Sequence, residues 1–155
     1  MTTRSLILIG FQSCGKTSIG QRFAAQTHRR FLDTDRLLEA AYAQKTGQNL
    51  SCSDIYHALG SEAFRSLEHS LLTNLPKGAD TVIATVGGII LLPHNLSLLR
   101  AIGHIVYLSL SYATLLARLQ ARTLPAYMPN TATQDFPNVY RQREPLYRQF
   151  ADSIL

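Results

Sequence analysis

One short segment near the N-terminus constrains this chain more than any other. Residues 10–17 read GFQSCGKT and have the G-x-x-x-x-G-K-[ST] spacing of a phosphate-binding loop. Glycines in such a loop let successive backbone N–H groups curl around a phosphate, and the N-terminus of the following helix adds positive potential. Lys16 of the motif reaches the β- and γ-phosphates of a nucleotide, and the Thr17 hydroxyl can bind Mg²⁺. A chance match has odds of roughly 1% or less, so the motif predicts a nucleotide site.

Strand-like and helix-like segments alternate along the whole chain. Short apolar runs predict strands at residues 5–10, 31–33, 81–86, 104–110 and 153–155. Apolar positions at helical spacing predict helices at residues 17–26, 36–44, 54–59, 61–75, 95–102 and 139–151 and after Ser111, with Ser61 and Ser111 as caps. Such alternation is typical of a parallel sheet with helices on both faces. We therefore expect a single three-layer α/β/α domain over residues 1–155.

Length and composition fit one such domain. The chain has 155 residues, of which 46% are hydrophobic and 16% charged, which excludes extensive disorder. Its longest apolar runs are far shorter than the ~20 residues that span a bilayer, and the N-terminus has no small-residue cleavage site, so neither a membrane segment nor a signal peptide is expected. Two cysteines without CxxC spacing argue against a disulfide scaffold or structural zinc. A cytoplasmic location is expected.

Arginine supplies most of the positive charge of this chain. Formal net charge is +5, and twelve of the fifteen basic residues are Arg. The guanidinium fork suits planar or multi-oxygen anions, and a compositional bias toward Arg is the equally good alternative. The arginines are scattered along the chain and form no single stripe, so nucleic acid is not an expected partner.

Two acidic residues follow the predicted second strand. Asp33 and Asp35 stand in the sequence DTD, at the carboxyl end of a strand where parallel sheets bind ligands. One carboxylate can support Mg²⁺ from the second coordination shell, and the other can act as base for a substrate hydroxyl. The alternative is a helix N-cap, since an Asp before RLLEAAY suits that role.

Two further segments carry candidate binding groups. Arg65 and Glu68 stand at i,i+3 in the sequence FRSLE, a spacing that usually marks a solvated ion pair. Because both border the apolar stripe of their helix, Glu68 can instead hold the Arg65 fork toward a ligand carboxylate. Gly87 and Gly88 close a strand and expose backbone N–H groups to a ligand, or form a bare turn.

A loop-like segment at residues 123–138 precedes the last helix. It contains three prolines and little apolar periodicity, and a loop of this length in a small domain is more often a functional lid than a slack connection. Two arginines, Arg141 and Arg143, follow it within residues 140–147. The five histidines show no metal-ligand spacing, so Mg²⁺ is the catalytic metal that we expect.

Taken in order, these segments resemble the shikimate kinases. The resemblance covers nearly the whole chain through GFQSCGKTSIG, FLDTD, FRSLE, VIATVGG, HIVYLSL and REPLYRQFAD. It implies a nucleoside-monophosphate-kinase-like P-loop fold with a five-stranded parallel sheet, a lid at residues 123–138 and substrate-binding helices at residues 36–75. It further implies transfer of the γ-phosphate of ATP to the 3-hydroxyl of shikimate, with Mg²⁺, in the pathway to chorismate and the aromatic amino acids. A monomer is expected.

The resemblance also implies roles for residues at matching positions. Asp33 would position Mg²⁺ through water together with Thr17, and Asp35 would bind the shikimate hydroxyl and favour its deprotonation. Arg65 and Arg143 would grip the substrate carboxylate, Glu68 would orient Arg65, and Gly87 and Gly88 would donate backbone N–H groups. Lys16 and Arg122, the nearest candidate for the lid arginine, would join Asp35 in catalysis. The expected nucleotide-binding residues are Gly10, Ser13, Cys14, Gly15, Lys16, Thr17, Ser18, Arg118 (against the adenine) and Arg122.

The sequence departs from the family pattern at three places. Val86 replaces the first glycine of a triplet and would be strained if that position requires a positive φ. Leu124 stands before Pro125 where the family's lid has Arg. The sequence stops at Leu155, before the family's adenine-cradling loop and helix, so we expect a changed nucleotide affinity and one helix fewer on one sheet face. A gluconate-kinase-like enzyme of the same fold and a nucleotide-binding module without catalysis are the alternative functions.

Overall fold

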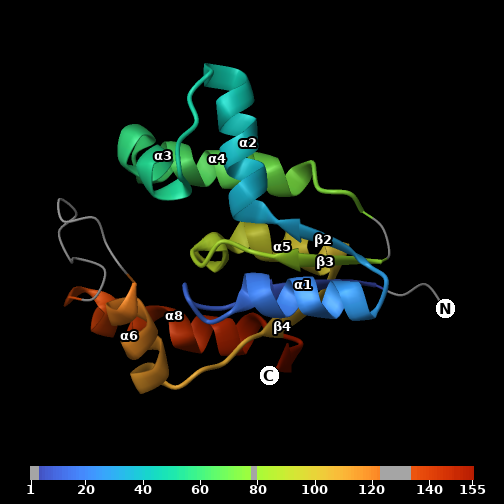
Figure 1. Ribbon diagram of the computed structural model, residues 1–155, viewed down its shortest axis with the longest axis vertical. Coiled ribbons are helices and arrows are strands. Elements are labelled where there is room, and N and C mark those ends of the chain that lie inside the picture. Colours follow the sequence, from blue (N-terminus) through green and yellow to red (C-terminus); the bar gives the residue numbers. More distant parts are fainter. Residues whose placement is uncertain (1–3, 78–79, 123–133) are drawn as a thin grey trace.

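Five parallel strands form the sheet of the protein, in the order β2-β3-β1-β4-β5. The computed structural model describes residues 4–77, 80–122 and 134–155 (Figure 1). The strands are β1 (Ser5–Ile9), β2 (Arg30–Asp33), β3 (Thr81–Ala84), β4 (Gly103–Tyr107) and β5 (Ser153–Ile154). The helices are α1 (Lys16–Gln26), α2 (Thr34–Thr46), α3 (Cys52–Leu59), α4 (Ser61–Thr73), the 3₁₀ turn η1 (Ile89–Leu91), α5 (Pro93–Ile102), α6 (Tyr112–Ala121) and α8 (Phe136–Phe150).

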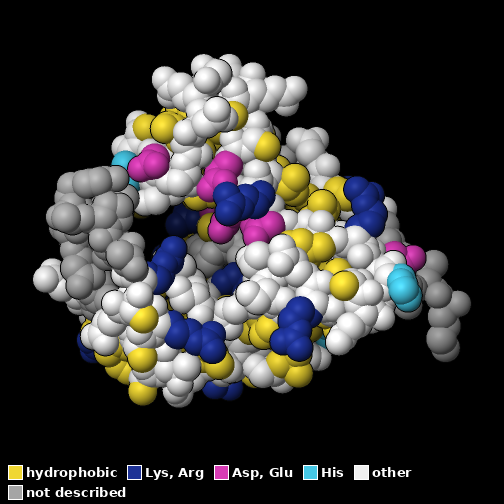
Figure 2. Space-filling view, viewed as in Figure 1, with side chains coloured by type: hydrophobic (Ala, Val, Ile, Leu, Met, Phe, Trp, Pro, Cys, Tyr) yellow, Lys and Arg dark blue, Asp and Glu magenta, His cyan; other side chains and the backbone are white. Residues whose placement is uncertain are grey.

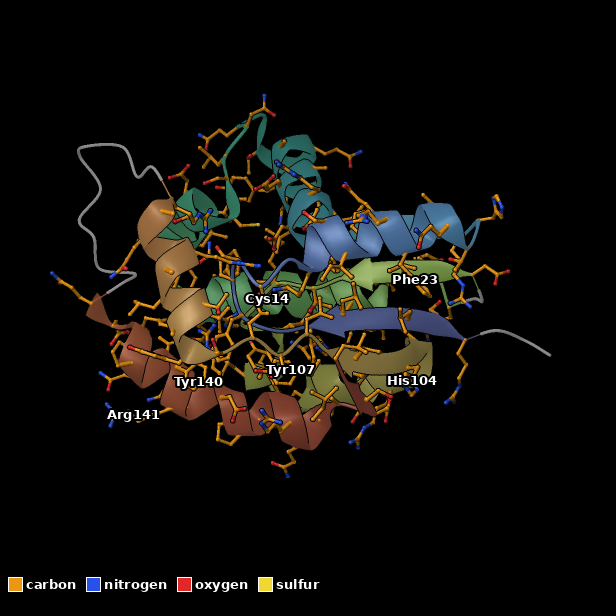
Figure 3. The ribbon with its side chains drawn as sticks, turned by 60° about the horizontal axis from the view of Figure 1, so that its bottom comes forward. Cys14, Phe23, His104, Tyr107, Tyr140 and Arg141 are labelled. Carbon is orange, nitrogen blue, oxygen red and sulfur yellow. The ribbon has the colours of Figure 1, made fainter. Side chains whose placement is uncertain are left out.

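The three central strands are apolar because both of their faces are covered. β1 pairs with β3 through Ile7 and Ile83 and with β4 through Ile7 and Ile105, and all three side chains are fully buried. Continuous apolar runs of this kind are typical of parallel strands between two helix layers. Helix α1 lies on one face of the sheet, and α5 and α8 lie on the other (Figures 1 and 3). The predicted three-layer domain with a five-stranded parallel sheet is confirmed.

Helices α2, α3 and α4 stand together beyond the β2 edge of the sheet, at the top of Figure 1. They have a small core of their own, in which Leu38, Ile55 and Phe64 are buried. This second core fixes α4 relative to α2, and so it positions side chains of α4 at the end of the sheet.

Most predicted elements are present with shifted ends. Ser111 caps α6 as expected, since its side chain accepts a hydrogen bond from the Thr114 N–H. Ser61 does not cap α4; it is the first helical residue, and Gly60 holds the cap position with φ 82°. The strands predicted to end at residues 86 and 110 end earlier, at Ala84 and Tyr107.

The last helix is longer than predicted. It starts at Phe136 rather than at residue 139, because Pro137 in its first turn suits a helix start, where no N–H partner is needed. Residues 136–138 of the predicted loop 123–138 are therefore helical. Residues 123–133, with Leu124 and Pro125, lie outside the described residues. Within the described parts of the chain, every helix is too short or too polar to cross a membrane.

Candidate active site

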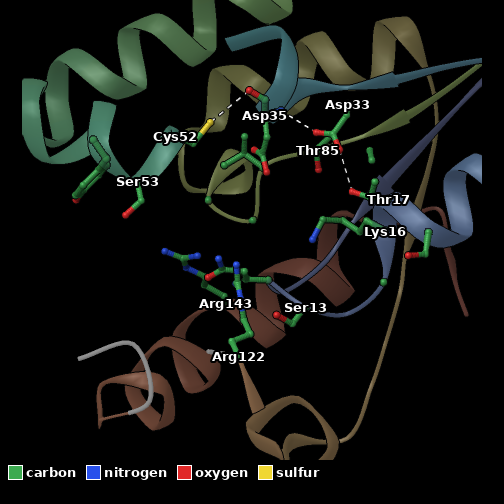
Figure 4. Close-up of a pocket in the computed structure, with 18 of the residues that line it drawn as sticks. Ser13, Lys16, Thr17, Asp33, Asp35, Cys52, Ser53, Thr85, Arg122 and Arg143 are labelled. Carbon is green, nitrogen blue, oxygen red and sulfur yellow. Dashed lines mark hydrogen bonds between the residues drawn. The ribbon is translucent and has the colours of Figure 1, made fainter. Parts of the chain in front are cut away.

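A cavity of about 740 Å³ opens where the chain leaves the carboxyl ends of β1, β2 and β3. Residues after each of these strands line it: the phosphate loop after β1, the two aspartates after β2, and residues 85–88 after β3. Figure 2 shows the hollow with basic and acidic side chains gathered around it. In Figure 4, Arg122 and Arg143 approach from one side and Asp33 and Asp35 from the other. The cavity thus brings together groups that are distant in the sequence.

The phosphate loop adopts a backbone that its glycines permit. Gly10 and Gly15 have φ values of 149° and 98°, where side chains are strained. A Cβ on Gly10 would also lie 2.9 Å from the Cys14 Sγ and 3.1 Å from the Leu108 carbonyl. Gly15 precedes α1 without a side-chain cap, so the first N–H groups of that helix are open to an anion.

Lys16 is held inside the loop. Its Nζ donates hydrogen bonds to the carbonyls of Gly10 at 2.8 Å and Phe11 at 2.7 Å, and the side chain is buried. Burial lowers the pKa of Lys16, an effect that the negative charges of Asp35 and Asp33 oppose. Because burial disfavours the ammonium, an anionic ligand in the loop would stabilise its charged form.

Asp33 caps helix α2 and also contacts the phosphate loop. The predicted cap, the Asp directly before RLLEAAY, is Asp35, which instead lies in the first turn of that helix. The Asp33 Oδ1 accepts the N–H of Asp35 at 3.0 Å, which makes Asp33 the N-cap of α2. The Asp33 Oδ2 accepts the hydroxyl of Thr17 at 2.9 Å (Figure 4). The cap fixes the carboxylate, and the carboxylate in turn orients the Thr17 hydroxyl at the start of α1. The helix cap and a metal-supporting pair of oxygens are therefore compatible at this position.

Asp35 lines the cavity, and among the described residues one of its two carboxylate oxygens, Oδ1, is buried without a hydrogen-bond partner. Burial raises the pKa of Asp35, the charge of Asp33 raises it further, and Lys16 opposes the rise. A carboxyl group with a raised pKa beside an ammonium group has the properties of a general base.

The Arg65–Glu68 pair is buried rather than solvated. Arg65 Nη1 donates to Glu68 Oε2 at 2.6 Å, and the two side chains are 16% and 1% exposed. Burial raises the pKa of Glu68, and the hydrogen bond and charge of Arg65 oppose that rise. A Cβ on Gly88 would lie 2.6 Å from the Arg65 guanidinium nitrogens, so the glycine provides the space that this side chain occupies. The solvated interpretation of the pair is wrong, because tertiary packing covers it.

Three more arginines reach the cavity from the other side. Arg143 projects from α8, and Arg118 and Arg122 come from the C-terminal end of α6. Arg118 donates to the carbonyl of Ser13 at 3.1 Å, which places it against the phosphate loop. Of the other predicted site residues, Gly87, Gly88 and Ser18 line the cavity, whereas Gly10, Cys14 and Glu68 lie behind its wall and support it.

Val86 is not strained. Its φ is negative, and its N–H donates to the buried Thr34 hydroxyl at 2.9 Å. The condition for strain, a positive φ at this position, is therefore not met. The Val86 side chain instead forms part of the cavity wall.

Helix α3 contributes cavity residues that the sequence did not reveal. Cys52, Ser53 and Tyr56 line the same space. The Cys52 thiol donates to the Asp35 carbonyl at 3.4 Å, and burial raises the pKa of that thiol, so it is a structural contact. The segment lies within residues 36–75, which the family resemblance implied to be substrate-binding helices, but these individual residues were not predicted.

A sheet in the order 2-3-1-4-5, with a phosphate loop after its first strand and a carboxylate after its second, defines a P-loop kinase. The chain belongs to the shikimate kinase family, whose sequence model, described as shikimate kinase, matches residues 12–155. It is therefore a phosphotransferase of the shikimate pathway.

Individual relatives agree with this placement. The chain is 34% identical to the shikimate kinase of Aromatoleum aromaticum and 36% identical to that of Xylella fastidiosa; each alignment covers 97% of this chain, with 83% and 81% of the respective relative. Among solved structures it is similar to the shikimate kinase of Acinetobacter baumannii in complex with shikimate. That comparison has a TM-score of 0.83 and 29% identity, and covers 99% of this chain and 83% of the other.

Proposed function

We propose that this cavity carries out the ATP-dependent phosphorylation of the 3-hydroxyl of shikimate. The observation that carries the proposal is the shared lining of the cavity: Lys16 of the phosphate loop, the carboxylate of Asp35, and the Arg65 and Arg143 guanidinium groups. A polyphosphate donor fits the loop, an acceptor carboxylate fits the two arginines, and the base lies in the same space. A phosphoryl transfer needs this positioning and charge neutralisation more than it needs covalent chemistry.

The donor side is formed by the phosphate loop and the end of α6. The open N–H groups at the start of α1 and the Lys16 ammonium would bind the β- and γ-phosphates of ATP. Arg118, held against Ser13, would lie beside the adenine, and Arg122 would neutralise charge on the transferred group. The remaining loop residues, Gly10, Ser13, Cys14, Gly15, Thr17 and Ser18, would shape the phosphate cradle.

Thr17 and Asp33 fit a Mg²⁺ ion that accompanies ATP. Both are hard oxygen donors fixed at 2.9 Å from one another by a hydrogen bond, which is the chemistry that Mg²⁺ prefers. When bound, Mg²⁺ supplies positive charge to the phosphate oxygens.

On the acceptor side, Asp35 would accept the proton of the 3-hydroxyl as that oxygen attacks the γ-phosphorus. The new O–P bond forms while the bond between the γ-phosphorus and the β,γ-bridging oxygen breaks, and ADP leaves. Arg65, oriented by Glu68, and Arg143 would hold the carboxylate of shikimate. The N–H groups of Gly87 and Gly88 would complete the pocket.

The alternative acceptor is a gluconate-type substrate. The two arginines alone do not distinguish it from shikimate. ADP release should be measured with shikimate, gluconate and the methyl ester of shikimate as acceptors. We expect shikimate to be preferred, and we expect the ester to react poorly because it lacks the charge that the arginines bind. A preference for gluconate, or equal rates with shikimate and its ester, would contradict the proposed acceptor site.

We also propose that the enzyme is a cytoplasmic monomer. Both of its cysteines are free thiols, which suits a reducing compartment. Sedimentation of the purified protein with and without ATP tests the oligomeric state.

A further inference from the structure

Tyr147 lies behind the cavity, at the point where three of its walls meet. It belongs to α8, one helical turn after Arg143, so the two side chains share a helix face. Its side chain is fully buried. The ring packs edge-on against Phe11 of the phosphate loop, with centroids 4.9 Å apart, and stacks on Tyr107 of β4 at 5.1 Å. These contacts fix the plane of the ring and therefore the place of its hydroxyl.

The hydroxyl of Tyr147 is used for a specific contact. It donates a hydrogen bond to the carbonyl of Gly87, in the loop that follows β3. Gly87 also packs on the phosphate loop, since a Cβ built on it would lie 3.6 Å from both the Gln12 nitrogen and the Gly10 oxygen. The peptide that follows Gly87 carries the N–H of Gly88, which lies against Arg65. One phenol thus sets the position of the backbone that faces the acceptor side of the cavity.

The same hydroxyl lies near the acceptor arginine of its own helix. Burial raises the pKa of Tyr147, and the charge and hydrogen bonding of Arg143 oppose that rise. The phenol is therefore neutral at ordinary pH. The hydroxyl donates a hydrogen bond to the Gly87 carbonyl, and its oxygen lone pairs can accept a further one.

We infer that Tyr147 is a positioning residue of the acceptor site, whose hydroxyl holds the Gly87 carbonyl, and with it the peptide that carries the Gly88 N–H, in the arrangement that binds the acceptor. This inference rests on the proposed function of the cavity. If Tyr147 served packing alone, a phenylalanine would replace it without effect on the acceptor, because the ring contacts with Phe11 and Tyr107 do not involve the hydroxyl. The hydroxyl and the ring can therefore be tested separately.

Tyr147→Phe keeps the ring and removes the hydroxyl. Tyr140→Phe is the matched control: Tyr140 lies on the same helix and stacks on Phe11 at 5.1 Å, and no hydrogen bond of its hydroxyl is recorded among the described residues. Binding of shikimate and of ADP should be measured by isothermal titration for both variants and the wild type. We expect Tyr147→Phe to bind shikimate about tenfold more weakly, the effect of one lost hydrogen bond. Its ADP affinity, and both affinities of Tyr140→Phe, should stay within about twofold.

Two results would overturn the inference. One is shikimate binding by Tyr147→Phe that stays within about twofold of the wild type. The other is an equal loss of shikimate and ADP affinity, which indicates a general packing defect. Failure of the proposed function is recognised separately, because wild-type protein would then bind no shikimate; the inference would fall with it.

Discussion

Arg65 donates to Glu68 from one turn earlier in the same helix, at 2.6 Å, in a setting where the glutamate is 1% exposed. An exposed pair at this spacing contributes little, but a buried one fixes both side chains. The Arg65 guanidinium also packs against Gly88, where a Cβ would lie 2.6 Å from its nitrogens. The pair therefore presents one fixed guanidinium face to the cavity, as recognition of a carboxylate requires.

Replacing Glu68 with Gln should weaken the acceptor site. The amide keeps a hydrogen-bond acceptor for Arg65 but removes the counter-charge that orients the guanidinium. We expect the KM for shikimate to rise about tenfold, with a smaller change in the KM for ATP. Steady-state kinetics with each substrate varied in turn measure both values.

The control for Glu68→Gln is Arg36→Gln. Arg36 forms an i,i+3 pair with Glu39, at 3.1 Å, and its side chain is 81% exposed. Its loss should change the free energy of unfolding by less than about 0.5 kcal/mol and leave both KM values near those of the wild type. If Glu68→Gln behaved like this control, Glu68 would not orient Arg65.

Asp35→Asn removes the proposed base and should lower kcat by about 10²–10⁴-fold. Burial and the neighbouring Asp33 disfavour the ionised carboxylate, so the neutral amide should also raise the free energy of unfolding at neutral pH. Turnover assays and denaturant unfolding would show the two opposite changes. Near-normal turnover in a folded variant would remove Asp35 from the role of base.

The pH dependence of turnover and that of the free energy of unfolding should both follow from the Asp35 carboxyl group. The pKa of Asp35 is higher in the folded protein than in the unfolded chain, so its ionisation destabilises the fold above the unfolded value. That penalty begins to shrink as pH falls below the folded pKa and is gone below the unfolded pKa, so the stability advantage of Asp35→Asn should shrink over this range. Because a base must be ionised, kcat/KM of the wild type should fall as pH decreases, beginning at a pH above the ordinary carboxyl range. A rate that is flat through this range would contradict the assignment.

Much of this site could be predicted because its phosphate loop and its two aspartates lie at the carboxyl ends of strands. The phosphate loop and the DTD sequence each follow an apolar run, and parallel strands bring such ends to one edge of a sheet. The burial of Glu68 could not be predicted, because i,i+3 spacing is the same for exposed and buried pairs. Tyr147 carried no signal either: its hydrogen bond to Gly87 joins residues 60 positions apart. The start of α8 at Phe136 could not be predicted, because the sequence around Pro137 is typical of loops as well as of the first turns of helices.

Val86→Gly should not relieve strain, because Val86 has a negative φ and a satisfied N–H. We expect the glycine to lower the free energy of unfolding by about 0.5–1 kcal/mol, through the greater backbone entropy of the unfolded chain. Urea denaturation of both proteins measures the difference. A more stable Val86→Gly variant would mean that the valine is strained after all.

The most direct test of the whole account is the amount of ADP released when a limiting quantity of shikimate is added to the enzyme with excess Mg²⁺ and ATP. We expect one ADP for each shikimate added, with no release beyond the background without acceptor. Release that stays at this background, from a folded protein that binds ATP, would contradict the claim that the cavity phosphorylates shikimate.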